Sequence, residues 1–195
     1  LDLFSLTALE ICEGQQLDMD FEERDDVTQE EYLEMIRLKT SVLLACSLKI
    51  GGLLGGATVE DASNLYNFGM QMGLAFQLKD DLLDVYGDAS VFGKNIGGDI
   101  LSNKKTFLLI KALEHADPDQ KKELNYWLTS VDFVPAEKIA AVTDLYNRIG
   151  VRKWCEDKIA DYTVKAIESL KLVDVDMEKK KELQRLIEKL MSREI

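Results

Sequence analysis

Apolar positions recur with the 3.6-residue period of α-helices along the whole chain, and no segment shows the strict two-residue alternation of a half-buried strand. Capping signals mark several helix starts. Thr28 is followed three residues later by Glu31, the spacing of a capping box. Pro118 and Pro135 fit the first turns of two later helices. The pattern therefore predicts an all-α fold.

The expected helices are joined by short polar or glycine-rich segments. They lie at about 1–20, 28–50, 59–86, 100–116, 118–129, 135–149, 151–171 and 176–193. The glycine-rich stretch 51–56 is expected to interrupt the helical pattern, and residues 88–99 are expected to form a loop. No repeat or long linker divides the chain, so we expect residues 1–195 to form a single all-helical domain. Because the sequence opens without Met inside a helical pattern, we expect a bundle that is incomplete at its N-terminal side.

Composition narrows the classes of function. The 195 residues are 46% hydrophobic, and the net charge is −12, which argues against nucleic acid as a partner because phosphate backbones require a basic surface. No apolar run approaches the roughly 20 residues of a membrane span. Cys12, Cys46 and Cys155 lie far apart, which favours a reduced, cytoplasmic setting. The single histidine, His115, stands at a predicted helix end, which argues against a histidine-based metal site or a Ser-His triad.

The strongest chemical signal is the segment FQLKDDLLD. On a helix, four of its polar residues fall within one arc of about 100°, namely Gln77, Asp80, Asp81 and Asp84. Carboxylates this close repel one another by a few tenths of a kcal/mol per pair. A shared hard cation such as Mg²⁺ would relieve that repulsion. The alternative is a solvated acidic stripe, although the apolar run Phe68–Leu83 argues against exposure of this helix.

Two glycines precede this acidic segment on the same predicted helix. Gly69 and Gly73 lie two turns and one turn before Gln77. A glycine inside a helix costs about 1 kcal/mol relative to alanine. The pair therefore indicates that a ligand or a neighbouring helix approaches closely, and ordinary tight helix packing is an equally open explanation.

Lys39 interrupts an apolar stripe. The helix expected at 28–50 carries one apolar face, formed by Tyr32, Met35, Ile36, Leu43, Cys46 and Ile50, and Lys39 sits in its middle. Lysine seldom stays buried without an anionic partner. The alternative is a lysine that extends its ammonium group to solvent from the edge of the stripe.

Two further signals are weak by themselves. The segments GKNIGGD at 93–99 and NKKT at 103–106 place lysines next to glycines shortly after the acidic segment, a composition that suits phosphate oxygens but also an ordinary surface loop. Near the start of the chain, GQQLD places Gln15 and Asp18 on one helix face.

Together these segments resemble the downstream part of the trans-isoprenyl diphosphate synthase (polyprenyl synthetase) family, as in farnesyl and geranylgeranyl diphosphate synthases. The patterns GQxxD, KT, FQxxDDxLD, GKxxGxD and NKxT occur in that order within residues 1–115. The resemblance implies an isoprenoid synthase-type helical bundle that acts as a Mg²⁺-dependent, homodimeric prenyltransferase. Such an enzyme condenses an allylic diphosphate with isopentenyl diphosphate, through an allylic cation, to a longer trans-prenyl diphosphate.

The resemblance also implies metal ligands. Asp80, Asp81 and Asp84 resemble the second aspartate-rich motif of the family. Asp80 would bind Mg²⁺ directly, and the other two carboxylates would act mainly through water molecules. The family also needs a first aspartate-rich motif. The pair Asp25-Asp26 is followed by Gln29 where that pattern requires Asp, so DDxxD occurs once in this sequence.

The remaining implied roles concern the diphosphate and the cation. Three lysines would bind the allylic diphosphate, namely Lys39, Lys94 and Lys104. The side-chain oxygens of Thr40 and Gln77 would face the allylic cation. Asp18 would orient Lys39, and Gln15 would belong to the same polar wall.

Two other classes of protein remain open. The chain would also suit a non-catalytic partner subunit of a prenyl synthase or a class I terpene cyclase, although the intact acidic motif disfavours the first. A cyclase would carry an Asn/Ser/Glu metal motif, which this sequence lacks. With one DDxxD pattern and scattered arginines, the 195 residues alone are expected to be inactive.

Overall fold

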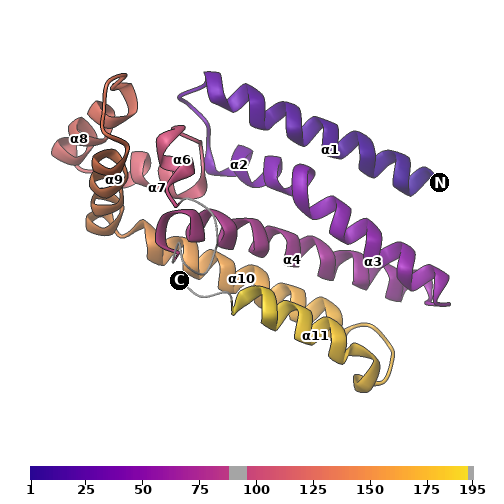
Figure 1. Cartoon of the computed structure of the whole chain (residues 1–195). Coiled ribbons are helices and arrows are strands. Elements are labelled where there is room, and N and C mark those ends of the chain that lie inside the picture. The colour runs from indigo at the N-terminus through magenta and orange to yellow at the C-terminus, as the bar shows by residue number, and fades with distance from the viewer. Residues whose placement is uncertain (88–95, 193–195) are drawn as a thin grey trace.

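The computed structural model describes residues 1–87 and 96–192, and within them every regular element is helical, which confirms the predicted all-α fold (Figure 1). A short 3₁₀ turn, Phe21–Glu23, follows the first helix, and a π-helical turn, Arg37–Ser41, joins α2 to α3. The α-helices are α1 (Asp2–Asp20), α2 (Gln29–Ile36), α3 (Val42–Leu54), α4 (Val59–Tyr86), α6 (Gly98–Leu101), α7 (Phe107–His115), α8 (Pro118–Thr129), α9 (Pro135–Ile149), α10 (Val151–Lys171) and α11 (Met177–Met191).

Helix α4 is the centre of the bundle. It runs through the middle of Figure 1, with α3 along one side and α10 along the other. Helix α1 covers the π turn and α3, and α11 lies against α10 and α4. Half of the residues of α4, 14 of 28, are buried, as expected for a helix surrounded by others. Helices α8 and α9 gather beyond the C-terminal end of α4.

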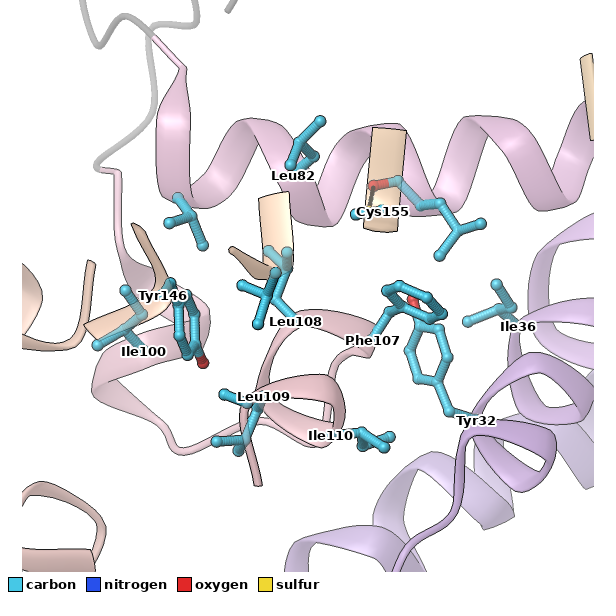
Figure 2. Close-up of a cluster of buried hydrophobic side chains, with 14 of the residues drawn as sticks. Tyr32, Ile36, Leu82, Ile100, Phe107, Leu108, Leu109, Ile110, Tyr146 and Cys155 are labelled. Atoms are coloured by element: carbon cyan, nitrogen blue, oxygen red, sulfur yellow. Dashed lines mark hydrogen bonds between the residues drawn. The ribbon is translucent and has the colours of Figure 1, made fainter. Parts of the chain in front are cut away.

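The main core joins α2, α4, α7, α9 and α10. Figure 2 shows Tyr32 of α2 beside Phe107 of α7, with their ring centroids 6.5 Å apart. Cys155 of α10 lies under α4, where its thiol is 3.7 Å from the carbonyl oxygen of Leu78. The first contact joins α2 to α7, and the second places α10 against α4 just before its acidic segment.

Most helix boundaries agree with the sequence-based prediction, and two segments differ. Residues 51–54 continue α3 instead of interrupting it. The single helix expected at 100–116 is two helices, α6 and α7. The break between them follows from Asn103, which has a left-handed φ of 53°, and from Thr106, whose hydroxyl caps α7 by accepting the N–H of Leu109. Residues 88–95 of the expected loop lie outside the described part of the chain.

The π turn changes the register of the apolar stripe around Lys39. Tyr32, Met35 and Ile36 are buried as predicted, but Leu43 is 48% exposed. A π turn inserts one extra residue, so a face followed at 3.6 residues per turn is displaced beyond it. Within the described residues no helix has both the length and the apolar character needed to cross a membrane.

Candidate active site

Side chains from α1, α2, the π turn, α4 and the turn after α6 meet around a small cavity. Its volume is about 30 Å³, and its polar wall is formed by Asp18, Lys39, Gln77, Asp81 and Lys104. A larger cavity of about 360 Å³ opens between the end of α1 and residues 102–105, and Asp18 and Lys104 line both cavities. The structure therefore brings together residues that the sequence places up to 86 positions apart.

Gly14 lets α1 approach the backbone of the π turn. A Cβ atom on Gly14 would lie 2.8 Å from the carbonyl carbon of Leu38, closer than real side-chain contacts allow. One turn later on α1, Asp18 Oδ2 lies 2.5 Å from Lys39 Nζ. The predicted Asp18–Lys39 contact is present, and Gly14 makes it possible. Gln15 is exposed and is not one of the residues lining the small cavity.

Gly69 and Gly73 likewise let α4 approach its neighbours closely. Their Cβ atoms would lie 2.7 Å from Ala45 Cα and 2.6 Å from Ser41 Cα, so a neighbouring helix does approach here. One turn after Gly73, Gln77 Oε1 accepts a hydrogen bond of 3.1 Å from the Thr40 hydroxyl. Adjacent residues of the π turn thus contact two different helices, Lys39 reaching α1 and Thr40 reaching α4.

The three aspartates of α4 do not share one environment. Asp80 and Asp84 are half-buried, and Asp84 Oδ2 accepts the backbone N–H of Asp99 at 2.9 Å. Asp81 is 3% exposed and accepts hydrogen bonds from the Tyr32 hydroxyl and from Gln77 Nε2. A helix turns by about 100° per residue, so Asp80 and Asp81 occupy opposite ends of the predicted arc. The sequence showed that these side chains share one face of the helix. Only the packed structure shows that Asp81 lies at the edge of this face that points into the core.

The acidic groups perturb one another. Burial raises the pKa of Asp81 to about 7, and the neighbouring carboxylate of Asp99 adds to the shift. Burial also raises the pKa of Asp99, with the charges of Asp84 and Asp80 acting in the same direction. Excess negative charge at this end of α4 therefore favours a bound cation.

Lys104 stands at the edge of this acidic region. Its ammonium nitrogen is 3.5 Å from Asp99 Oδ1. Burial alone would lower its pKa, but the carboxylates of Asp99, Asp81 and Asp18 outweigh burial and raise it, so the side chain is firmly cationic. Lys94, the third predicted phosphate-binding lysine, lies outside the described residues.

The carboxylates of α4 suit a Mg²⁺ ion whose other ligands come from water and a phosphate, and they do not form a complete metal site by themselves. Among residues 1–87 and 96–192 no three His, Cys, Asp or Glu side chains converge as a ready-made metal site. Mg²⁺ commonly uses one or two carboxylates and takes its other ligands from water and phosphate oxygens. Asp80 and Asp84, one turn apart and half-buried, offer that arrangement.

Sequence reasoning assigned no individual role to Asn103, which belongs to the NKxT pattern, or to Lys138, which contacts Asn103. Asn103 Nδ2 donates to the Leu128 carbonyl at 2.9 Å, and Asn103 Oδ1 accepts from Lys138 Nζ at 2.7 Å. Lys138 is 1% exposed, and burial lowers its pKa. Asparagine is a common residue at left-handed φ, so its role at 103 had a sequence signal. Lys138 had none, because its partners lie 35 or more positions away.

Comparison with known proteins identifies relatives that match the part of the chain carrying these residues. A family model described as polyprenyl synthetase matches residues 1–149. The chain belongs to the polyprenyl synthetase family. This confirms the resemblance drawn from the five sequence patterns, all of which lie within the matched residues.

Individual polyprenyl synthetases are similar over most of this chain. A short chain isoprenyl diphosphate synthase of Methanothermobacter thermautotrophicus is 39% identical over 168 residues, which cover 86% of this chain and 51% of the relative. The crystal structure of a geranylgeranyl pyrophosphate synthase superposes with a TM-score of 0.92 at 42% identity, covering 100% of this chain and 60% of that one.

A second similar structure carries ligands. The structure of a Caulobacter crescentus polyprenyl synthase complexed with calcium and isoprenyl diphosphate superposes with a TM-score of 0.89 at 28% identity, covering 100% of this chain and 59% of that one. This polyprenyl synthetase chain thus spans about half the length of the relatives that it matches.

Proposed function

We propose that this chain provides the allylic-diphosphate side of the active site of a prenyl diphosphate synthase. Such an enzyme joins an allylic diphosphate to isopentenyl diphosphate and forms a longer trans-prenyl diphosphate. The observation that carries the proposal is the meeting of two pairs in the π turn, Lys39 with Asp18 and Thr40 with Gln77, directly beside the acidic end of α4.

Asp80 and Asp84 are the residues that would hold Mg²⁺. A bound Mg²⁺ neutralises charge on a departing diphosphate. The relative complexed with calcium and isoprenyl diphosphate supports a divalent cation and a diphosphate as ligands of this site. The net charge of −12 opposes binding of an anionic substrate, and a cation bound with the substrate would offset that repulsion.

The lysines complete the diphosphate site. Lys39 and Lys104 line the same small cavity, so their ammonium groups converge on one region. Asp18 holds Lys39 in place, and Asp99 does the same for Lys104. We propose that both lysines bind the diphosphate and stabilise the charge that develops on it as the allylic C–O bond breaks.

The remaining walls suit a short-lived carbocation. Gln77 lines the small cavity, and its carbonyl oxygen, together with the Thr40 hydroxyl that donates to it, would supply oriented dipoles for the cation. Met35 and Ile36 provide an apolar wall that excludes water, which would otherwise hydrolyse the allylic substrate.

The direct test is prenyl transfer by the protein that carries these residues. Incubation with Mg²⁺, an allylic diphosphate and labelled isopentenyl diphosphate should give labelled products extended by five-carbon units. Cyclic hydrocarbons formed without isopentenyl diphosphate would instead indicate a terpene cyclase. Product that forms only after a second subunit is added, and that survives Asp80→Ala, would indicate a partner subunit.

A further inference from the structure

A continuous line of hydrogen bonds crosses the site from α2 to the π turn. The Tyr32 hydroxyl donates to Asp81 Oδ2, and Gln77 Nε2 donates to Asp81 Oδ1 at 3.0 Å. At the other end of the Gln77 amide, Oε1 accepts from Thr40 at 3.1 Å. Tyr32 carried no functional signal in the sequence, where it reads as one more apolar position of α2.

Burial makes this arrangement specific. Tyr32 is 1% exposed and Asp81 is 3% exposed, so water has little access to compete for their hydrogen bonds. Each carboxylate oxygen of Asp81 has a protein donor. In its ionised form Asp81 only accepts hydrogen bonds, so it fixes the neighbouring amide with the NH₂ group toward Asp81 and the carbonyl toward Thr40.

We propose that Asp81 and Tyr32 are positioning residues that hold the carbonyl oxygen of Gln77 toward the reacting carbon atoms, and that Asp81 is not a metal ligand. This inference rests on the proposed prenyl transfer and gives Asp80 and Asp81 different roles. Asp80 faces the cation and the diphosphate, and Asp81 faces inward and orients the dipole that stabilises the carbocation. The implied water-mediated metal role of Asp81 is thereby replaced.

The first test separates metal binding from positioning. Asp81→Leu keeps the approximate size of the side chain and removes both acceptors. Calorimetric titration with inorganic diphosphate at a series of Mg²⁺ concentrations should give a Mg²⁺ requirement within about twofold of the wild type, whereas Asp80→Ala should raise it by about tenfold or more. An equal rise in both variants would make Asp81 a metal ligand and overturn the proposal.

The second test observes the amide of Gln77 directly and needs no turnover. In a ¹H–¹⁵N spectrum, the side-chain NH₂ signals of Gln77 are assigned by their loss in Gln77→Leu. One of the two protons should appear downfield and exchange slowly in the wild type, and both should move to solvent-like positions in Asp81→Leu. Unchanged Gln77 signals in that variant would refute the positioning role, whether or not the protein transfers prenyl groups.

Tyr32→Phe gives a milder variant that keeps the core packing. It should shift the Gln77 signals in the same direction and lower kcat by about threefold to tenfold with little change in KM for the allylic diphosphate. Tyr86→Phe is the matched control, because the buried Tyr86 hydroxyl has no hydrogen-bond partner among the described residues. If Tyr32→Phe and Tyr86→Phe behave alike, the Tyr32 hydroxyl has no positioning role. Absence of prenyl transfer in the unsubstituted protein that carries these residues would refute the proposed function, while the spectra would still decide this inference.

Discussion

At the scale of single residues, the site depends on pairs that hold functional groups in fixed directions. Lys39 is the clearest case. Its side chain is 35% exposed, so it is neither a fully buried charge nor a free surface lysine. The ammonium group is held by Asp18 at the mouth of the cavity, where it can neutralise an anion without a large desolvation cost.

Replacing Lys39 with Met separates its charge from its packing. Lys39→Met keeps the apolar stem, and Asp18 remains partly solvated, so we expect the folded state to persist. Prenyl transfer should fall by about tenfold or more, because a preorganised positive charge is lost from the diphosphate site. Lys153→Met, which removes a 77% exposed lysine on α10, should leave turnover unchanged. Normal turnover of Lys39→Met would show that the charge of Lys39 has no part in prenyl transfer.

At the scale of elements, glycines set the distances between helices. Gly14 and Gly73 each remove a side chain at a point of closest approach, and each is followed one turn later by a residue that contacts the π turn. Helix packing and the geometry of the candidate site are therefore coupled. A change that pushes α4 away from the π turn displaces Gln77 from Thr40.

Two glycine-to-alanine substitutions should have opposite effects on stability. The Cβ of Gly73→Ala would lie 2.6 Å from Ser41 Cα, and such overpacking costs about 1–3 kcal/mol. Gly51 also lies in a helix but has no atom within 4 Å of the added Cβ, so Gly51→Ala should stabilise by up to about 1 kcal/mol. Urea unfolding monitored by circular dichroism measures both. Destabilisation of equal size in the two variants would contradict the close-approach account.

The sequence predicted where helices begin better than it predicted which side of each helix is buried. Capping residues and prolines are local signals, so the starts of α2, α4, α8 and α9 were placed correctly. The π turn has no such signal, and because it was not predicted, Leu43 was wrongly placed on the buried face. The sequence placed Asp81 on one arc with Asp80 and Asp84, because helical periodicity gives an angle and not a neighbour. Only the packing of Tyr32 against α4 shows which edge of the arc is internal.

At the scale of the whole molecule, these 195 residues supply one acidic face and one group of lysines. DDxxD occurs once in the sequence, and the chain spans about half the length of its relatives. Helix α1 exposes several large apolar side chains, among them Phe4, Leu6 and Leu9, each more than 50% exposed. Exposed apolar residues on one helix favour association.

A polypeptide of these 195 residues alone should therefore give no prenyl product. The residues of a catalytic constellation act as a unit, so loss of part of it removes far more than a proportional share of the rate. We expect it to fold and to associate as its concentration rises, which sedimentation velocity would show. Labelled prenyl product above background from this polypeptide would require a second metal-binding face within the 195 residues.

The central claim is that Asp80 and Asp84 form a Mg²⁺-dependent diphosphate site with Lys39 and Lys104. Isothermal titration of the protein that carries these residues with inorganic diphosphate tests it most directly. Binding should require Mg²⁺, disappear in EDTA, weaken by about tenfold or more in Asp80→Ala, and remain unchanged in Asp157→Ala, which removes an exposed carboxylate on α10. Equal binding in Mg²⁺ and in EDTA would contradict the account.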